Sequence, residues 1–395
     1  MAVTHPTAEV VETIAPVEPQ PTGEQEQPRG QLLPALARRL QSLDAFRGLT
    51  ILGMLMVNNM ALGAAMRGLF AHAPWNGSIH FADLVFPWFL LIVGVALPFS
   101  AAAFREKGGT LRRYLSKVFT RAVVLVLLGL LVDSSIIRTP FLGLGVLQII
   151  GLAYFTAALA ALLPLRYRLP LASLLLLGHW AAIRFIPLPG LAAGTFTEQQ
   201  NLIAYLNQTY LASWHLSGLI SLIPTTALVI IGTALGELLR HASLPPLRKW
   251  LALTVIGLLL MLGGWLWNLD LPFNKAVWTP SFIVFTGGLG AVVLGFFYLT
   301  IEIRGWRSWA FPLVVFGANA IMAYALPILA KTLILQVWTW PMPDGASLSL
   351  LEAYIKWLIA TAGRIPGGWL YTASYILCWW LILLYLYRKR LFLRV

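Results

Sequence analysis

The chain has 395 residues, of which 59% are hydrophobic and only 11% are charged. Soluble domains average about 25% charged residues, so this composition, with a mean hydropathy of +0.78, excludes an ordinary soluble protein. The net charge of +13 does not indicate nucleic-acid binding, because the basic residues are sorted by membrane side, as described below. The single cysteine, Cys378, excludes a disulfide framework and a thiolate metal cluster.

Residues 1–37 are predicted to form a disordered cytoplasmic tail. They are rich in Glu and Pro and show no apolar periodicity. They also have neither the basic start nor the apolar stretch of a signal peptide. We therefore expect a transmembrane domain over residues 38–390 and a short cytoplasmic end at residues 391–395.

Ten apolar stretches follow the tail, each close to the roughly 20 residues that a membrane-spanning helix needs. The sequence therefore predicts an all-α, polytopic integral membrane protein with about ten transmembrane helices. The expected spans are residues 48–66, 81–103, 118–137, 144–164, 170–187, 217–239, 250–267, 281–303, 309–330 and 367–387.

The distribution of Lys and Arg predicts the orientation of these spans. If the N-terminus is cytoplasmic, seven of the 28 basic residues lie outside and three times as many lie inside. By the positive-inside rule, this bias places both termini in the cytoplasm. The outer basic residues are then Arg67, Arg138, Arg184, Lys275, Lys331, Lys356 and Arg364.

Polar and charged side chains concentrate around the first two expected spans. Asp44 and Arg47 begin the first span, and Asn58 lies about 21 Å further along its axis at 1.5 Å per residue. His72 lies in the outer connection that follows, and Asp83 begins the second span. Such groups are costly in a bilayer and mark functional sites. The pattern predicts a line of polar groups between the two faces, typical of a site reached from both sides.

Each of these residues also has a purely structural interpretation. Asp44 can interact with the helix dipole, Arg47 can act as a cytoplasmic anchor, and Asn58 can bond to a neighbouring helix. His72 alone is more often an interfacial histidine than a catalyst, and Asp83 is placed where a helix cap is expected. Their concentration within forty residues nevertheless favours chemistry at a membrane face.

Seven segments along the chain carry recognisable motifs. They are Ser42-Leu-Asp44-x-Phe46-Arg47-Gly48, Val57-Asn58, His72-Ala-x-Trp75-Asn76-Gly77, Ala82-Asp83-Leu-Val-Phe-Pro87-Trp-Phe, Gly145-Val-Leu-Gln148-x-Ile-Gly151-x-x-Tyr154, Asn274-Lys275-x-x-Trp278-Thr279-x-Ser281-Phe282 and Phe316-Gly317-x-Asn319-Ala320. Together they resemble the heparan-alpha-glucosaminide N-acetyltransferase family of transmembrane acyltransferases. The resemblance extends over roughly residues 39–330.

The resemblance implies an activity and its main residues. Members of that family transfer an acetyl group from cytoplasmic acetyl-CoA to a sugar amine on the far side of the membrane. His72 matches their catalytic histidine, and Asn58 matches the asparagine beside it. The chain departs from the family at Ile149, where an Arg is frequent. It also shows no large lumenal domain like that of the animal enzyme, so we expect a bacterial-type relative in the inner (plasma) membrane, with the His72 loop outside and a periplasmic or cell-wall sugar as acceptor.

The chemistry of these side chains is consistent with acyl transfer. Histidine exchanges protons near neutral pH, so His72 can deprotonate an attacking amine or hydroxyl, or it can accept the acetyl group itself. Asn58 can donate a hydrogen bond to the oxyanion that develops on the thioester. The anionic CoA nucleotide is expected to meet cytoplasmic cations such as Arg47, Arg112, Arg113 or Arg121.

The remaining site residues are assigned by the side of the membrane on which they lie. A structural alternative for the Asn274 to Trp278 segment is an interfacial anchor, and for Asn319 it is a helix-packing amide. No metal site is expected, because the His and acidic residues lack metal-ligand spacing. For acetyl-CoA we expect Asp44, Arg47, Gln148 and Asn319; for the acceptor we expect Trp75, Asn76, Asp83, Asn274, Lys275 and Trp278.

The main alternative function is a membrane transporter of a small polar or glycan-related solute. Transporters often contain two related halves with interrupted helices, but the motifs around Asp44 and His72 occur once, with no counterpart in the second half. The expected partners are acetyl-CoA, a sugar or glycan acceptor and the lipid bilayer, without nucleic acid. His179 and His215 are expected to have no role. The sequence leaves open a homodimer, N- versus O-transfer, acyl length, and one-step transfer versus an acetyl-histidine intermediate.

Overall fold

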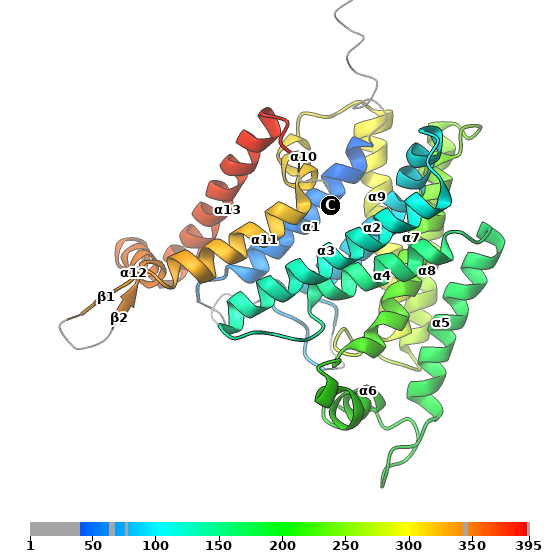
Figure 1. The fold of residues 1–395 in the computed structure, drawn as a ribbon, viewed down its shortest axis with the longest axis horizontal. Helices are drawn as coiled ribbons and strands as arrows, with labels where there is room; N and C mark the ends of the chain where they lie inside the picture. Colours follow the sequence, from blue (N-terminus) through cyan, green and yellow to red (C-terminus); the bar gives the residue numbers. More distant parts are fainter. Residues whose placement is uncertain (1–39, 63–67, 76–77, 343–346, 393–395) are drawn as a thin grey trace, which may run out of the picture. The chain divides into compact units, whose positions relative to one another are not determined.

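The computed structural model describes residues 40–62, 68–75, 78–342 and 347–392, which form helices, connecting loops and one two-stranded antiparallel sheet (Figure 1). The tail expected at residues 1–37 and the acceptor residue Asn76 lie outside the described residues. The part from Leu40 onward forms a unit of its own. The predicted helical class is therefore confirmed for the described part of the chain.

The elements follow one another with few long connections. The first group is α1 (Gln41–Asn58), η2 (Gly68–Phe70), α2 (Phe81–Glu106), α3 (Leu111–Ile137), α4 (Val146–Ala160) and α5 (Leu165–Phe185). The second group is α6 (Leu202–Leu206), η3 (Asn207–Leu211), η4 (Ala212–Trp214), η5 (Leu219–Ser221), α7 (Leu222–Arg240), α8 (Pro246–Asn268), α9 (Pro280–Phe297) and η6 (Tyr298–Ile303). The last group is α10 (Phe311–Ala318), α11 (Ala320–Ala330), η7 (Lys331–Leu335), β1 (Thr339–Pro341), β2 (Ser347–Ser349), α12 (Leu350–Ala362) and α13 (Arg364–Arg388).

Six helical segments of the described residues are long and apolar enough to cross a membrane, and a broken pair brings the number to seven. The six segments include α2, α3, α7, α8, α9 and α13, and the pair consists of α10 with α11, bent by 78°. The protein is therefore an integral membrane protein. α1, α4 and α5 occupy three further expected spans but are not among these helices, so the total of ten and the cytoplasmic termini stay predictions.

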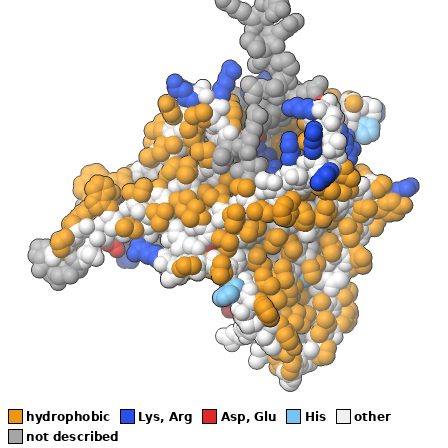
Figure 2. Space-filling view, in the orientation of Figure 1, with side chains coloured by type: hydrophobic (Ala, Val, Ile, Leu, Met, Phe, Trp, Pro, Cys, Tyr) orange, Lys and Arg blue, Asp and Glu red, His pale blue; other side chains and the backbone are white. Residues whose placement is uncertain are grey.

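The long helices differ in how much of their surface they bury. In their most apolar stretches, α2, α7 and α9 bury 61–67% of their residues, whereas α3, α8 and α13 bury only 17–28%. Figure 2 shows hydrophobic side chains across the middle of the visible face and most visible Lys and Arg near its upper edge. An apolar exterior with charge at one end of the helices is expected of a protein surrounded by lipid.

Close packing between helices depends on glycines. A Cβ atom on Gly94 of α2 would collide with the carbonyl of Val229 in α7, and one on Gly232 would collide with α2. A Cβ on Gly48 of α1 would collide with the backbone of α10, and one on Gly317 would collide with the Asp44 carbonyl. Because helices in lipid associate through backbone proximity rather than hydrophobic burial, these glycines allow the two contacts.

The break between α10 and α11 lies beside the start of α1. A broken helix exposes backbone groups that must find other partners in a membrane. Arg47 donates to the Gly317 carbonyl (3.5 Å) and to the Asp44 carboxylate (2.8 Å). Asn319, at the break, donates through Nδ2 to the Leu391 carbonyl (3.0 Å). Three of the residues expected to bind acetyl-CoA thus contribute to the packing of this region.

Candidate active site

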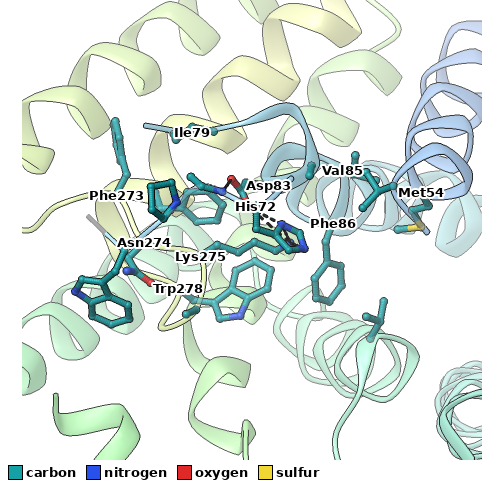
Figure 3. Close-up of a pocket in the computed structure, with 18 of the residues that line it drawn as sticks. Met54, His72, Ile79, Asp83, Val85, Phe86, Phe273, Asn274, Lys275 and Trp278 are labelled. Carbon is teal, nitrogen blue, oxygen red and sulfur yellow. Dashed lines mark hydrogen bonds and ion pairs between the residues drawn. The ribbon is translucent and has the colours of Figure 1, made fainter. Parts of the chain in front are cut away.

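A cavity of about 540 Å³ brings together segments that are far apart in the sequence (Figure 3). Its wall comes from the end of α1, the loop before α2, the start of α2, the loops before α4 and α9, the segment near residue 198, and α11. The polar and aromatic residues in the wall include Asn58, His72, Trp75, Asp83, Glu198, Asn274, Lys275, Trp278 and Tyr324.

His72 and Asp83 form the closest polar pair in this cavity. His72 Nδ1 lies 2.8 Å from Asp83 Oδ1. A carboxylate accepts hydrogen bonds, so Nδ1 carries the proton and Nε2 retains its lone pair. The Asp83 side chain is 3% exposed, whereas that of His72 is 58% exposed. The carboxylate is therefore fixed, and the imidazole is accessible to a ligand.

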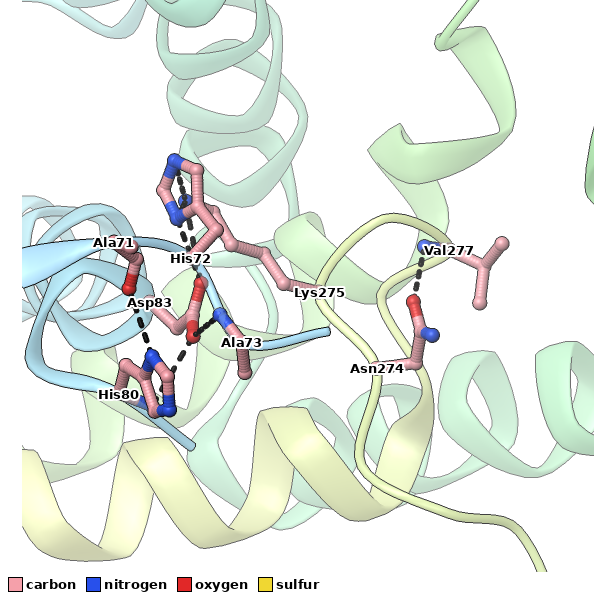
Figure 4. Close-up of polar contacts among 8 residues, drawn as sticks. All are labelled: Ala71, His72, Ala73, His80, Asp83, Asn274, Lys275 and Val277. Carbon is pink, nitrogen blue, oxygen red and sulfur yellow. Dashed lines mark hydrogen bonds and ion pairs between the residues drawn. The ribbon is translucent and has the colours of Figure 1, made fainter. Parts of the chain in front are cut away.

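The second oxygen of Asp83 organises the loop that carries His72 (Figure 4). Asp83 Oδ2 accepts hydrogen bonds from the backbone N–H groups of Ala73 (3.0 Å) and His80 (3.1 Å). His80 in turn donates through Nδ1 to the Ala71 carbonyl (3.0 Å). Asp83 is therefore not the N-cap of α2, which is His80, but the third residue of the helix, whose carboxylate caps the His80 N–H and also holds the imidazole of His72.

Lys275 reaches the same pair from the loop between α8 and α9. Its Nζ lies 3.1 Å from Nδ1 and 3.4 Å from Nε2 of His72, and 3.9 Å from Asp83 Oδ1. Burial lowers the pKa of Lys275 to about 8, and the negative charge of Asp83 opposes part of that shift. Lys275 was expected to bind the acceptor, but its nearest polar neighbour in the described residues is His72.

The loop that presents Lys275 is held by its own polar residues. Asn274 Oδ1 accepts from the Val277 N–H (3.2 Å), and Thr279 Oγ1 accepts from the Asn274 N–H (3.0 Å) and donates to the Pro272 carbonyl (3.0 Å). The buried His179 donates through Nε2 to the Val277 carbonyl (3.1 Å). Asn274 therefore shapes the loop, and His179, which was expected to have no role, supports it.

Two tryptophans form aromatic parts of the cavity wall. Trp278, with φ 53°, packs edge-on against Phe86 with ring centroids 5.0 Å apart. Trp75 packs against Phe196 at 5.1 Å. The indole Nε1 of Trp75 is buried and has no hydrogen-bond partner among the described residues. A buried donor without a partner is costly, so this wall suits a ligand that carries an oxygen atom.

Asn58 lies at the end of α1, where the helix leaves carbonyl groups unpaired. Lys331 donates to the Asn58 carbonyl (3.0 Å) and to Asn59 Oδ1 (3.2 Å), and Thr372 donates to the Asn59 carbonyl (2.9 Å). These contacts fix the end of the helix and leave the Asn58 side chain in the cavity wall. The sequence analysis assigned no role to Lys331. Its position directly after an apolar span could have indicated that it contacts a neighbouring helix end.

The residues expected to bind acetyl-CoA lie elsewhere. Gln148 is fully buried and donates to Asp133 Oδ2 (2.8 Å). Among the described residues, neither Gln148 nor Asp44, Arg47 or Asn319 lines the cavity, whose α1 residues begin at Met54. The structure therefore does not bring these four residues to His72, and their assignment stays a prediction.

Two residues of the wall were not anticipated. Glu198 comes from the long connection after α5, and its position among the few acids on the expected outer side was a usable signal. Tyr324 lies in α11 within an apolar stretch, and nothing in the linear sequence distinguishes it.

Comparison with known proteins identifies the family. A sequence model described as "Heparan-alpha-glucosaminide N-acetyltransferase, catalytic" matches residues 39–266. The chain belongs to this family. The matched part begins just before α1 and ends within α8, so it includes His72 and Asp83 and stops before Lys275.

Two mammalian relatives carry the family's name over most of this chain. Heparan-alpha-glucosaminide N-acetyltransferase from Homo sapiens is 25% identical over 440 residues, which cover 93% of this chain and 62% of the human protein. The protein of the same name from Mus musculus is 24% identical over 430 residues, covering 91% and 61%. The chain thus spans less than two thirds of the length of either relative.

Proposed function

We propose that this protein is a transmembrane acetyltransferase that moves an acetyl group from cytoplasmic acetyl-CoA to an amino group or hydroxyl of a sugar outside the cytoplasm. The observation that carries the proposal is the 2.8 Å contact between His72 Nδ1 and Asp83 Oδ1 in a cavity that Asn58 also lines. Membership of a family whose relatives are named as N-acetyltransferases supports the reaction type.

His72 has the geometry of a general base. Asp83 accepts the proton of Nδ1, so the Nε2 lone pair is available to remove a proton from the acceptor as it attacks the acetyl carbon. The same lone pair can attack the thioester and carry the acetyl group in a two-step transfer. Both routes require an imidazole that is fixed at one nitrogen and accessible at the other, as the exposures of 58% for His72 and 3% for Asp83 provide.

Hydrogen-bond donors in the cavity wall can stabilise the oxyanion that develops on the thioester carbonyl. Lys331 holds the backbone carbonyl of Asn58, the Asn58 amide lies in the cavity wall, and the Trp75 indole offers a buried N–H without a partner among the described residues. A single preorganised donor of this kind contributes about 10²–10³ in turnover. Trp75 and Trp278 also offer flat apolar faces for a sugar ring.

Acetyl-CoA, the acetyl donor, requires a cationic site for its phosphates as well as a cavity for its thioester end. At about 540 Å³, the cavity is within the range for small ligands, which accommodates the acetyl thioester end and the sugar. The CoA phosphates need guanidinium partners. Arg121 of α3 lies 4.8 Å from the centre of the Tyr154 ring, and its Nε is buried without a partner among the described residues. Arg121 also hydrogen-bonds to Tyr154, so Arg121 and Arg47 both have protein partners, and the buried Nε of Arg121 is the donor proposed for a phosphate oxygen.

The direct test uses purified protein in detergent with radiolabelled acetyl-CoA and a panel of amino sugars and neutral sugars. We expect label to transfer to a sugar, and His72→Ala to reduce turnover by at least about 10²–10⁴, the contribution of general-base catalysis. His241→Ala serves as the control, because this exposed histidine contacts Ser243 in the α7–α8 connection. Parent-like transfer by His72→Ala would refute the catalytic role. Sugar uptake into vesicles without acetylation would indicate a transporter.

A further inference from the structure

Lys275 lies closer to the imidazole of His72 than to any carboxylate in the described residues. Its Nζ is 3.1 Å and 3.4 Å from the two ring nitrogens, against 3.9 Å from Asp83 Oδ1. Because Nδ1 directs its proton at Asp83, the ring nitrogen that can exchange a proton with Lys275 is Nε2. Figure 4 shows the lysine side chain extending from its loop to this ring.

Lys275 places a positive charge 3.9 Å from Asp83, but the hydrogen bonds of this carboxylate do not depend on it. The two carboxylate oxygens of Asp83 already interact with His72 Nδ1 and with the backbone N–H groups of Ala73 and His80. The Lys275 side chain is 24% exposed and projects into the cavity wall beside His72. A lysine that only anchors the protein at the membrane interface would extend its ammonium group into water, whereas the ammonium group of Lys275 lies against His72.

The reaction needs an acid as well as a base. When the acceptor nitrogen, oxygen or His72 Nε2 bonds to the acetyl carbon, the carbon–sulfur bond breaks and its electron pair leaves on sulfur as a thiolate. His72 cannot protonate this sulfur while it is attacking the thioester or removing the acceptor's proton. A second group that holds a proton beside His72 can protonate the sulfur as it leaves in either route.

We infer that Lys275 is the general acid that protonates the departing CoA thiolate and then recovers its proton from His72. In the one-step route, the proton of the acceptor moves to His72 Nε2 while the Lys275 ammonium gives a proton to sulfur. The imidazolium then returns its proton to the neutral Lys275 amine. Overall, one proton passes from the acceptor to sulfur, an amide or ester and a free thiol result, and both side chains regain their starting states. This inference rests on the proposed function.

The ionisable groups around Lys275 favour this exchange. The titratable residues that line the cavity with it are His72, Asp83, Glu198 and Tyr324. Burial lowers the pKa of Lys275 to about 8 against the opposing effect of Asp83, close to the value of about 8.5 for an ordinary thiol. Proton transfer between Lys275 and a thiolate is therefore nearly balanced, whereas an ordinary lysine near 10.4 would retain its proton.

The pH dependence follows from the same values. Below about pH 8, Lys275 is protonated and can donate its proton; above it, the acid form is lost. We expect the turnover of the parent protein with acetyl-CoA to fall as pH rises through this range. Lys275→Met should show a much lower rate without this alkaline decrease.

A leaving-group experiment tests the acid role directly. S-phenyl thioacetate releases an aromatic thiolate that needs no protonation, whereas acetyl-CoA releases an alkyl thiolate that does. We expect Lys275→Met to lose about 10²–10⁴ of kcat/KM with acetyl-CoA and to stay near the parent value with the aryl donor. Lys275→Arg should behave like Lys275→Met, because arginine keeps the charge but does not release its proton. Lys356→Met, at an exposed position in α12, is the matched control.

The outcomes separate this inference from the proposed function. Equal losses with both donors, or activity restored by Lys275→Arg, would overturn the acid role while leaving the transferase intact. A parent protein that transfers from neither donor would overturn the proposed function and the inference with it. Independently of turnover, modification of the parent protein by acetic anhydride, followed by mass spectrometry, should show Lys275 titrating near pH 8. Titration of Lys275 near the value of about 10.4 for an ordinary lysine would contradict the inference.

Discussion

Asp83 performs two tasks with its two oxygens. One accepts from the His72 imidazole at 2.8 Å, and the other accepts from the backbone N–H groups of Ala73 and His80 at 3.0 and 3.1 Å. The first contact fixes which ring nitrogen carries the proton, and the second fixes the loop on which the ring stands. Orientation of the base and capping of α2 therefore depend on the same carboxylate.

Asp83→Asn separates charge from size at this position. The amide of asparagine has one accepting oxygen and one N–H₂ group, whereas both oxygens of Asp83 accept hydrogen bonds. One of the present donors would therefore face the N–H₂ group, and the Nδ1–H tautomer of His72 would no longer be fixed. We expect turnover to fall by about 10²–10⁴ while the protein stays folded, because the amide oxygen can still accept from the loop N–H groups that Asp83 Oδ2 holds now. The measurement is kcat together with thermal stability in detergent.

Asp270→Asn is the matched control, since that carboxylate pairs with Arg184 and Trp180 outside the cavity lining. Parent-like turnover of Asp83→Asn, or equal turnover losses in both variants, would contradict the role of Asp83 as the residue that orients His72.

The residues of the site differ in how far the sequence could predict them. His72 and Asp83 are eleven residues apart and flank the start of one helix, so local sequence sufficed to place them together. Lys275 is 203 residues from His72, and its contact depends on how the loop before α9 packs against α2. Asn274 was expected to bind the acceptor because it lies on the expected outer side of the membrane, but its hydrogen bond to the loop backbone is visible only in three dimensions.

At the scale of elements, α1 is the support for Asn58. Near its start, the helix contacts α10 through Gly48 and Gly317, and the Asp44–Arg47 pair reaches the Gly317 carbonyl. At its end, Lys331 holds the last carbonyl. A helix whose backbone is fixed at both ends places the Cα of Asn58 at a defined point beside the cavity, which is a first requirement for an oxyanion donor.

Gly317→Ala should disturb this support. The added methyl group would collide with the Asp44 carbonyl at a backbone contact that cannot yield without moving a helix. Overpacking of this kind costs about 1–3 kcal/mol, so we expect lower thermal stability in detergent, measured by size-exclusion chromatography after heating.

Gly178→Ala in α5 is the control, because a Cβ at that position meets no atom within 4 Å and alanine favours helix formation. An unchanged melting temperature for Gly317→Ala would show that α1 and α10 are less closely packed than described.

Hydropathy predicted most of the long helices, since a run of about 20 apolar residues has few alternatives in lipid. It did not anticipate the break within residues 309–330, where the structure has α10 and α11 bent by 78° at Asn319. The break is supported by Arg47 and by the Leu391 carbonyl, which lie far away in the sequence. The β1–β2 hairpin and α12 were likewise not predicted, because their sequences carry no strong periodic signal.

At the scale of the whole transmembrane unit, the cavity and the basic residues belong to different ends of the helices. The cavity is built where α1 ends and α2 begins. Lys and Arg are concentrated where α2 ends, α3 and α8 begin and α13 ends. If the basic end is cytoplasmic, the proposed function requires CoA to approach from that end and the acceptor from the other, so that the acetyl group travels along α1 to reach His72.

Accessibility of introduced cysteines tests this orientation. In a Cys378→Ser background, which removes the single native cysteine, Ala193→Cys and Ser243→Cys probe two exposed connections. Ala193 follows α5, and Ser243 lies in the basic connection between α7 and α8. On intact cells, a membrane-impermeant maleimide should label Ala193→Cys and should label Ser243→Cys only after lysis. The reverse pattern would place the His72 loop in the cytoplasm, and the donor and acceptor routes would exchange sides.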